Sequence, residues 1–326
     1  METFKKTGNQ FPEDERNIGN STSSRHIAPG KLKELSHINN KFALLSLLET
    51  LVALAISILL CWYLDHPVIT VIILVFIGTR QHAVFVLVHE ATHFRLFSNR
   101  KLNDAMGTLL GAIICISFQR YRNLHFKHHS HLYQKEDPDI PLQSGYPQGF
   151  LHLFKKLSRD LLGATFLKTY AYFWRISATL PLDSNRTGGS LRHRRNLDLT
   201  LTVLVYISVG TFSVINELAL FFLLCWILPL LTIVPAIFRL RAICEHGAVS
   251  NIICPLNSSR TNSGSKFLIW TLFPHNVNYH LEHHLYPSIP QYNLPKVHQV
   301  LSKTQRMKGA EYKNIGTTLS LIFSKP

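Results

Sequence analysis

Charged residues, and acidic residues in particular, are scarce in this chain, and so are cysteines. Only 16% of its 326 residues are charged, with 19 Asp plus Glu against 34 Lys plus Arg. The apolar content and the lack of an internal repeat exclude disordered, collagen-like and coiled-coil classes. The five cysteines are odd in number and never form a Cys-x-x-Cys pair. We therefore interpret them as small core residues in a reducing compartment, not as a disulfide framework.

Hydrophobic residues, in contrast, make up 46% of the chain and gather in long runs. Four runs are long enough to cross about 30 Å of hydrocarbon as helices, namely residues 42–64, 68–88, 197–215 and 218–238. Pro229 and Pro235 predict a kink in the last run. Residues 105–118 would make only about 21 Å of helix, so we expect them to lie along the membrane or dip into it. The predicted fold class is an all-α integral membrane protein with about four transmembrane helices.

Polar segments flank and connect these runs. Residues 1–40 are polar and lack the features of a signal peptide, so we predict a disordered tail. Residues 41–310 are expected to form a single membrane-embedded domain, and residues 311–326 a C-terminal tail. Between the second and third predicted spans, residues 119–196 are basic and contain amphipathic stretches such as 150–162, which suit a helical cap on the bilayer surface.

The distribution of positive charge predicts the orientation in the membrane. The two short loops at residues 65–67 and 216–217 contain no Lys or Arg, whereas 33 of the 34 basic residues lie on the opposite side. The remaining one, Arg80, lies within the second run beside Gln81 and His82, a polar patch that we expect where the helix leaves the lipid. The positive-inside rule places both termini and the cap in the cytosol, of a bacterial inner membrane or the endoplasmic reticulum. No module that interleaves aromatic and basic residues is visible, so we expect no nucleic-acid partner.

Eighteen histidines are the unusual feature of the composition. Three compact clusters lie on the predicted cytosolic side, H-E-A-T-H at residues 89–93, H-F-K-H-H at 125–129 and H-L-E-H-H at 280–284. Histidines at positions i, i+3 and i+4 share one helix face, so each cluster presents two or three imidazoles to one point. Eight imidazoles are more than one tetrahedral ion uses, and they imply two metal ions in the cap.

Other interpretations of these clusters remain open. One histidine pair on a helix is often packed or solvated, but chance packing poorly explains a pattern that recurs three times on one side. Residues 89–93 also match H-E-x-x-H, the zinc metalloprotease signature in which Glu90 would activate water. That mechanism needs one further ligand and leaves most of the other cluster histidines without a role. A channel or transporter would need polar residues along the spans, and few are present besides residues 80–82.

The chain from about Arg80 to about Leu301 resembles the integral-membrane fatty acid desaturase superfamily, which includes hydroxylases, carotene ketolases and related non-haem di-iron oxygenases. The resemblance rests on three segments, HEATHFRLFSNRKLND, NLHFKHHSHLYQKEDPD and NVNYHLEHHLYPSIPQYNLP. Members often carry Asp where Glu90 stands, which leaves the ligand spacing intact. No H-P-G-G motif of a fused cytochrome b5 domain is present, so a separate carrier is expected to supply electrons.

The resemblance also implies a set of metal ligands. The family usually supplies one more histidine from the cytosolic end of the last span, which the segment RAICEHG matches with His246. The implied iron ligands are His89, His93, His125, His128, His129, His246, His280, His283 and His284. Residues expected to orient these ligands or to hold an iron-bound water are His82, Glu90, His131, Asp137, Asp139, Glu245, Asn276 and Asn278.

The activity that the resemblance implies is oxygen-dependent desaturation of a fatty acyl chain, with two irons as the cofactor and dioxygen as the co-substrate. Hydroxylation or ketolation of a lipid or carotenoid on the same site is the alternative, because nothing in the clusters decides between them. A substrate with a long apolar tail suits a metal site reached from the bilayer, and ferredoxin or cytochrome b5 with its reductase is the expected electron donor. Basic residues of the cap would suit a phosphate-bearing head group, although ordinary positive-inside charge is the better explanation of them: Arg120, Arg122, Lys127, Lys155, Lys156, Arg192, Arg194 and Arg195.

Overall fold

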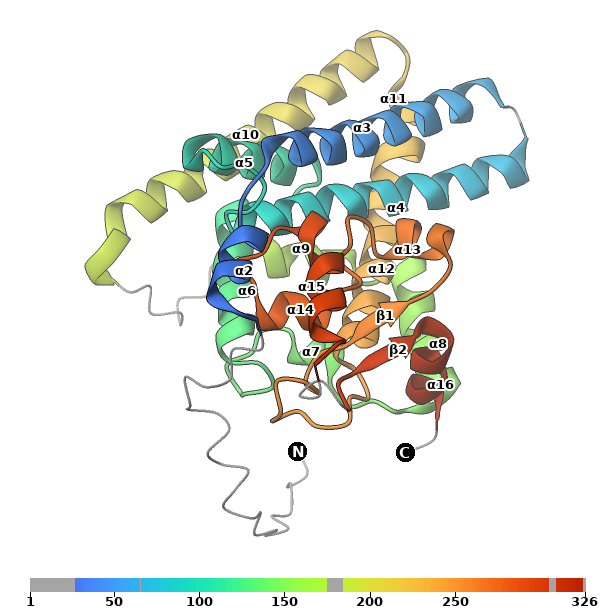
Figure 1. Ribbon diagram of the computed structural model, residues 1–326. Helices are drawn as coiled ribbons and strands as arrows, with labels where there is room; N and C mark the ends of the chain where they lie inside the picture. Colours follow the sequence, from blue (N-terminus) through green and yellow to red (C-terminus); the bar gives the residue numbers. More distant parts are fainter. Residues whose placement is uncertain (1–26, 65, 175–183, 305–308, 325–326) are drawn as a thin grey trace.

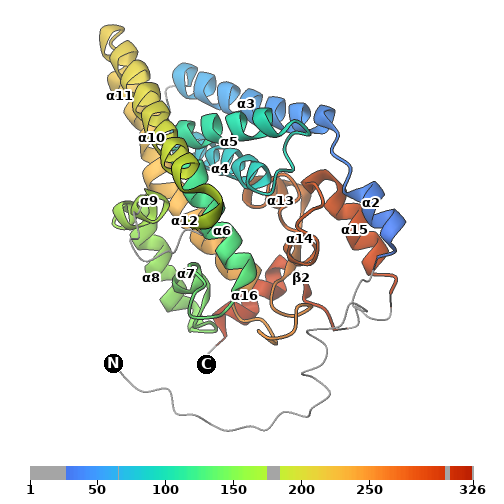
Figure 2. The same ribbon diagram turned by 90° about the vertical axis from the view of Figure 1, so that its left-hand side faces the viewer.

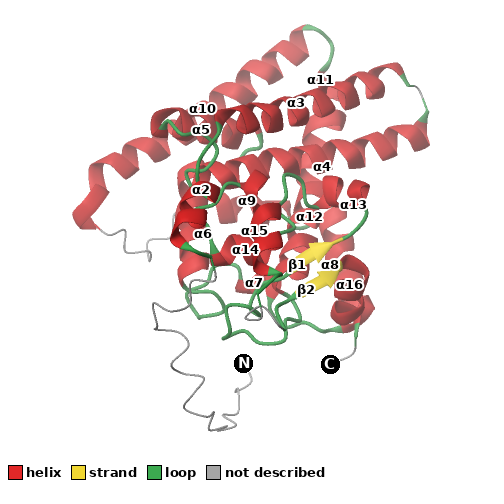
Figure 3. Cartoon of the chain, viewed as in Figure 1, coloured by secondary structure: helices red, strands yellow, loops and turns green. Residues whose placement is uncertain are grey.

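The structure is a computed structural model that describes residues 27–64, 66–174, 184–304 and 309–324. Helices dominate it, and the two short strands form one small parallel sheet (Figures 1 and 3). The elements in chain order are α2 (Pro29–Leu35), α3 (Asn40–Tyr63), α4 (Pro67–Thr92), α5 (Arg100–Ile113), α6 (Phe118–Ser130), α7 (Ile140–Gln143), α8 (Gly149–Leu161), α9 (Phe166–Trp174), α10 (Ser184–Ile215), α11 (Ala219–Phe222), the π-helical turn η1 (Leu223–Ile227), α12 (Leu228–His246), β1 (Thr261–Ser263), α13 (Lys266–Leu272), α14 (His280–Leu285), the 3₁₀ turn η2 (Gln291–Asn293), α15 (Leu294–Leu301), β2 (Tyr312–Asn314) and α16 (Ile315–Phe323).

Four helical segments are long and apolar enough to cross a membrane: α3, α4, residues 196–215 of α10, and α11 to α12 taken together. This confirms the predicted fold class and the number of spans. The second span is the central one, since 72% of its apolar window is buried, against 22% for α3 and 17% for α10. The outer spans expose large apolar side chains, which suits contact with lipid.

Local sequence explains where the first two spans begin and end. The side chain of Asn39 accepts a hydrogen bond from the backbone of Lys41 and caps α3, and Pro67 occupies the first turn of α4, where its missing N–H costs nothing. Helix α4 continues past the predicted end at residue 88 and runs to Thr92. The first histidine cluster therefore lies at the end of the helix, with His89 in the last turn and His93 as the C-cap, and its two histidines keep the i, i+4 spacing.

The polar patch of the second run, which we expect where the helix leaves the lipid, lies inside α4. Arg80, Gln81 and His82 are all fully buried and lie about three turns before Thr92. Each faces a different part of the protein: Arg80 bonds Glu49 of α3, Gln81 bonds the carbonyl of Trp226, and His82 contacts Arg241 of α12. Each of these polar side chains within a candidate span has at least one protein partner, although Oε1 of Gln81 and Nδ1 of His82 have none among the described residues.

Helices α5 and α6 form a bent pair that corresponds to the predicted short apolar segment. Their axes make an angle of 103° across a break of four residues or fewer, which fits a broken or re-entrant span. Helix α5 begins at Arg100, earlier than expected, where the side chain of Asn99 caps it. Gly107 permits the bend, because a Cβ there would lie 2.4 Å from the ring of Phe118 at the start of α6. The bend turns the second histidine cluster on α6 toward the end of α4.

The last span is irregular where proline falls. The π-helical turn η1 comes directly before Pro229, and Pro235 lies inside α12. A π-turn next to proline is a known way for a helix to accommodate the lost N–H donor. Beyond Pro235, α12 continues as regular helix to His246 and so reaches the level of the other histidine clusters (Figure 2).

Parts of both predicted tails are folded, which corrects their description as tails. Residues 1–26 lie outside the described part of the chain, but α2 follows them, and Ile27 and Leu35 are 1% and 2% exposed. Both pack with Leu281 inside the third histidine cluster and with Val297 and Leu301 of α15. At the other end, β2 pairs with β1, and α16 buries Ile315 and Ile322. The apolar positions in these short segments are too few for a sequence signal, but the fold supplies surfaces that bury them.

Candidate metal centre

The three histidine clusters and His246 converge on one region below the spans. They come from the end of α4, from α6, from the end of α12 and from α14, elements that lie side by side in both views of the ribbon (Figures 1 and 2). Every predicted metal ligand is present there. The structure sorts eight of the nine into two groups.

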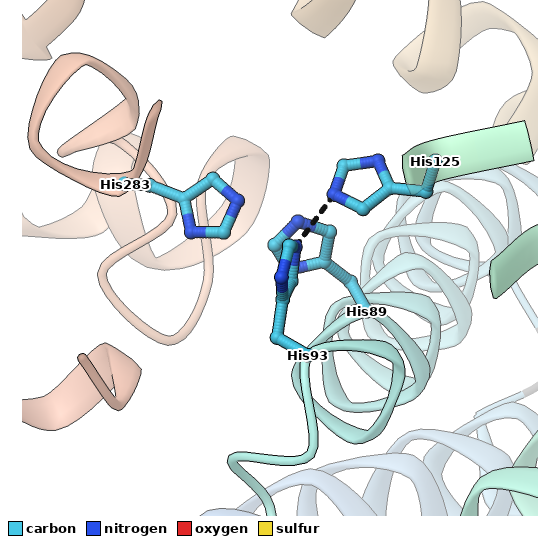
Figure 4. A group of neighbouring side chains, drawn as sticks. All are labelled: His89, His93, His125 and His283. Carbon is cyan, nitrogen blue, oxygen red and sulfur yellow. Dashed lines mark hydrogen bonds between the residues drawn. The ribbon is translucent and has the colours of Figure 1, made fainter. Parts of the chain in front are cut away.

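The first group contains His89, His93, His125 and His283. One nitrogen of each lies within 4.8 Å of the others, and all four residues are buried. Figure 4 shows their rings turned toward one another from α4, α6 and α14, and the Nε2 atoms of His93 and His125 are 2.8 Å apart. Each of the three histidine clusters therefore contributes to this group.

The second group contains His128, His246, His280 and His284, whose nitrogens also lie within 4.8 Å of one another. The Nε2 atom of His280 is 2.9 Å from that of His246 and 3.1 Å from that of His284. His246, which the sequence ties to the site only through the resemblance, is thus an equal member of a four-histidine set.

His129 lies between the two groups. Its Nε2 is 3.0 Å from that of His125 and 3.1 Å from that of His283, both in the first group. Its ring stacks on that of His284 in the second group, with the centroids 4.3 Å apart. The two metal positions implied by the groups are therefore neighbours that share this imidazole as a common contact.

The ring nitrogens of these histidines are suited to bind metal ions. His89 is 1% exposed, and neither of its ring nitrogens has a hydrogen-bond partner, which is costly for a buried polar group. Burial, and then the charges of Arg95 and Arg122, lowers the pKa of His93 to about 3. Burial, and then the neighbouring imidazoles of His89 and His93, holds the pKa of His283 well below its usual value. Neutral imidazoles with free lone pairs are the form that binds metal.

Contacts at Nδ1 of two histidines of the second group determine that Nε2 faces the metal position. Asp137 accepts a hydrogen bond from Nδ1 of His128 at 2.9 Å, and the carbonyl of Ser258 lies 3.2 Å from Nδ1 of His246. Asp137 is itself held by the backbone N–H groups of Tyr133 and Asp139. Burial raises the pKa of Asp137, but these hydrogen bonds outweigh it and the net shift is downward, so the carboxylate stays charged. Both histidines are left with Nε2 for a metal ion.

Replacing Asp137 with Asn should weaken metal binding in the second group. The amide keeps the size of the side chain, but its NH₂ would face the donors that now bond the carboxylate, and the orientation of His128 would be lost. Changes of this kind cost about 10–100-fold in metal affinity. Metal content per chain after dialysis against a chelator measures the effect, with the exposed neighbour Glu136→Gln as the matched control. Equal retention of metal in both variants would contradict a positioning role for Asp137.

The other residues predicted around the ligands fall into two sets. Asp139 and Glu245 lie close to the second group, with a carboxylate oxygen 3.6 Å from Nδ1 of His128 and 3.8 Å from Nδ1 of His280, respectively. Glu90 lies beside His89, but its carboxylate accepts the backbone N–H of Gln291. That contact occupies the carboxylate that an H-E-x-x-H protease would use to activate water.

Four further predicted residues make no contact with the metal groups among the interactions of the described residues. His82 reaches the site only through Arg241, which bonds Glu245 at 2.7 Å. His131 contacts Ser130 and the carbonyl of Lys127. The remaining two, Asn276 and Asn278, line a separate cavity of about 540 Å³ beside α3 and α13.

Some residues that support the site were missed in the sequence. His298 of α15 contacts Glu282 inside the third cluster at 2.6 Å, and Thr261 donates to the same carboxylate. Arg241 links His82 to Glu245 in the buried interior. The sequence could have pointed to Arg241, because a charged residue close to a predicted span is costly and usually has a structural or functional role. The sequence around His298 contains no pattern that links it to Glu282.

A cavity of about 410 Å³ leads to the histidines. His125, His128, His246 and His280 form its inner end. Aromatic side chains from α4, α6, α9 and α12 make its walls, and cations of α8, α9 and α12 surround its outer end. This is an apolar passage that ends at a buried cluster of metal-binding groups, a common form for the active site of an enzyme. The residues of the walls and the outer end are Phe85, Tyr121, Phe173, Pro235, Phe238, Lys156, Arg159, Lys168 and Arg239.

Comparison with protein families agrees with this geometry. The model of the fatty acid desaturase family matches residues 65–315, more than three quarters of the chain and all three histidine clusters. The chain belongs to the fatty acid desaturase family. This membership confirms the resemblance seen in the sequence and makes the protein an oxidoreductase of that family, with buried histidine clusters that could hold a metal.

Curated relatives of this desaturase-family protein act on different molecules. Dihydrorhizobitoxine desaturase of Bradyrhizobium elkanii is 27% identical over 291 residues, which cover 85% of this chain and 76% of the relative. The β-carotene ketolase of Paracoccus sp. (strain PC1) is 24% identical over 265 residues, 76% of this chain and 93% of the relative. A second β-carotene ketolase, of Paracoccus sp. (strain N81106 / MBIC 01143), is 23% identical over 74% of this chain and 86% of the relative. The names of these relatives include both desaturation and ketolation.

Proposed function

We propose that the protein is an oxygen-dependent, non-haem di-iron oxidoreductase that introduces a double bond into a fatty acyl chain. The observation that carries this proposal is an apolar cavity that reaches both four-histidine groups, with His125 of the first group and His128, His246 and His280 of the second in its lining. No amino-acid side chain removes hydrogen from an unactivated methylene, so the reaction needs a metal-based oxidant beside the chain. Membership of the fatty acid desaturase family supports the same class of reaction.

Iron is the proposed metal, held by the two four-histidine groups and His129. Imidazoles suit iron, zinc and copper alike, so the choice of iron rests on the resemblance to the non-haem di-iron oxygenases. When bound, two ferrous ions supply electrons to dioxygen and provide the oxidant for the methylenes. Desaturation of –CH₂–CH₂– to –CH=CH– then consumes one dioxygen, two electrons and two protons and releases two waters. The electrons come from an external donor, ferredoxin or cytochrome b5 with its reductase.

The side chains of the cavity hold and shield the acyl chain. Phe85, Tyr121 and Phe238 pack together, with ring centroids of Phe85 at 4.8 Å from Tyr121 and 4.5 Å from Phe238. Tyr121 also stacks on His125 at 5.4 Å, so the aromatic wall ends directly at the first metal group. Methylenes against this wall would be kept dry and close to the histidines.

Hydroxylation or ketolation is the second candidate, favoured by the two β-carotene ketolases among the relatives. Desaturation and hydroxylation differ in whether a second hydrogen leaves the chain or oxygen is transferred to it.

We further propose that the metal site and both termini face the cytosol, which the charge distribution supports because the short connections at residues 65–67 and 216–217 contain no Lys or Arg.

Expression in a host whose lipids lack unsaturated chains, together with ferredoxin or cytochrome b5 and a reductase, tests the reaction. We expect a lipid product that is lighter by two hydrogens in mass spectrometry and that disappears without oxygen. The control is His128→Ala, which should give no product. A product heavier by one oxygen assigns hydroxylation, and the absence of any oxidised acyl product contradicts the acyl substrate.

A further inference from the structure

Two of the five cysteines contact each other between the first and the last span. Cys61 lies in the last turn of α3 and Cys225 in the π-helical turn η1, 164 positions further along the chain, and their Sγ atoms are 3.2 Å apart. An S–S bond is about 2.05 Å long, so the two side chains together need to move by only about 1.2 Å to form one. The packing of the two spans therefore already brings the thiols together.

The other cysteines show no such arrangement. Among the interactions of the described residues, none of Cys115, Cys244 and Cys254 contacts another cysteine sulfur. Cys61 and Cys225 are also separate from the oxidation site, since neither belongs to the metal groups of the described residues or lines the cavity that leads to them. The contact between these two thiols is thus a feature that the proposed reaction does not use.

Both cysteines of the pair lie near the ends of their spans, on the same side of the membrane. Cys61 is two residues from the end of α3, and Cys225 is six residues from the start of α11, which correspond to about 3 and 9 Å along the helix axes. Beside them Trp62 packs edge-on against Phe221, with ring centroids 5.2 Å apart. Aromatic rings at span ends are typical of the boundary between lipid and water. The pair therefore lies close to the membrane surface that carries the two short connections.

The proposed orientation places this surface outside the cytosol. The connections at residues 65–67 and 216–217, which follow α3 and precede α11, contain no Lys or Arg. The outer face of a bacterial inner membrane, like the lumen of the endoplasmic reticulum, is an oxidising environment in which disulfides form and persist. The interpretation of the cysteines as residues of a reducing compartment therefore does not extend to this pair.

A bond at this point would support a span that has little other support. Helix α3 packs mainly on α4, and only 22% of its apolar window is buried. Within a bilayer, helices associate without the hydrophobic driving force that water provides. A covalent link would keep the outer end of α3 against the last span, and it would close a long loop in the unfolded chain.

We propose that Cys61 and Cys225 form a disulfide at the outer face of the membrane. The bond forms by exchange with an oxidant of the outer compartment, a protein or small molecule that carries a reactive disulfide. Cys61, which is more exposed than the buried Cys225, loses its proton and attacks the oxidant, and Cys225 then attacks the Cys61 sulfur of the mixed disulfide. The two cysteines lose two electrons and two protons, and the disulfide of the oxidant is reduced to two thiols. This inference goes beyond the proposed function and rests only on the proposed orientation.

The redox state of the thiols in cells tests the proposal. The full chain, expressed in a bacterial host, is precipitated in acid, denatured and treated with N-ethylmaleimide, which blocks free thiols. Reduction followed by a heavier maleimide then marks the cysteines that were bonded. We expect Cys61 and Cys225 alone to carry the heavier label, and the unreduced sample to contain their cross-linked peptides in mass spectrometry. Cys61→Ser or Cys225→Ser should abolish this labelling, whereas Cys254→Ser, the matched control, should keep it.

A second measurement separates the disulfide from the orientation on which it rests. Asn216 is exposed, so Asn216→Cys, combined with Cys61→Ser and Cys225→Ser, should react with a membrane-impermeant maleimide added outside the cells. Free thiols at Cys61 and Cys225 together with this reaction would overturn the disulfide alone. Free thiols without the reaction would overturn the proposed orientation as well. A bond from either residue to one of the other three cysteines would overturn the assignment of the partners.

Thermal unfolding in detergent measures what the bond contributes to stability. Reduction should lower the Tm by roughly 5 °C, because a disulfide that closes a long loop stabilises the folded chain. Cys61→Ser should unfold at the temperature of the reduced protein and should not respond to the reductant. An equal response of both proteins would show that the reductant acts at another place, and no response of either would contradict a stabilising bond between the two spans.

Discussion

Replacing His283 or His284 with Ala is expected to abolish oxidation, and each replacement should remove a different iron. The two histidines are neighbours on α14, but their side chains project about 100° apart and belong to the first and the second metal group, respectively. Even residues that only orient a ligand cost about 10–100-fold in metal affinity or activity, so loss of the ligand should leave less than about one hundredth of the activity. Iron per chain should fall from about two to about one in either variant.

Metal analysis by mass spectrometry, combined with the activity assay, measures both effects. His37→Ala and His152→Ala are the controls, because neither side chain belongs to the metal groups of the described residues. Replacement of His129 should affect both irons, since it contacts imidazoles of both groups. One zinc per chain, with activity that survives the loss of His283 and His284, would support a metalloprotease and contradict the di-iron site.

Breaking the half-buried ion pair between Glu49 of α3 and Arg80 of α4 should cause a large loss of stability. Glu49 accepts hydrogen bonds from Arg80 at 3.2 Å and from the indole of Trp270 at 2.5 Å, and the guanidinium of Arg80 lies 4.0 Å from the ring centroid of Trp270. The Arg80 side chain is 0% exposed, so Glu49→Leu would leave its charge buried without a carboxylate. Removal of one partner of a buried pair costs about 3–5 kcal/mol. We expect the lower end of this range, because the Glu49 side chain is 38% exposed.

The double variant Glu49→Leu, Arg80→Met separates the charge effect from a loss of packing. Replacement of both partners by apolar residues of similar volume is often neutral, so the double variant should be more stable than Glu49→Leu. Thermal unfolding in detergent, compared between the variants, measures the difference. Glu34→Leu is the control, since it removes an exposed pair with Lys31 that is worth less than about 1 kcal/mol. A double variant no more stable than Glu49→Leu would argue against an unpaired charge as the cause.

The spans and the histidine clusters could be predicted from sequence because each depends on local spacing. A run of apolar residues specifies a membrane helix wherever it occurs, and histidines three and four positions apart share a helix face whatever surrounds them. The ends of the helices were harder to predict: α4 extends past residue 88 into the first cluster and ends at Thr92, because helical hydrogen bonding continues where the hydropathy changes. Segments such as α2 and α16 could not be foreseen, since their few apolar residues are buried only by surfaces that the rest of the fold provides.

The sequence by itself determined that this chain spans a membrane and collects many imidazoles on one side. Only the tertiary structure decided how those imidazoles are shared, because His125 and His128 lie three residues apart on one helix and yet belong to different groups. The same holds for the cations of the cavity. Lys156 and Lys168 lie on separate helices and Arg239 more than 70 residues further on, so their common opening follows from the packing of α8, α9 and α12 and from no pattern along the chain. Ligand spacing is a local property of a helix, whereas the division of ligands between two metals and the charge around a cavity depend on which helices meet.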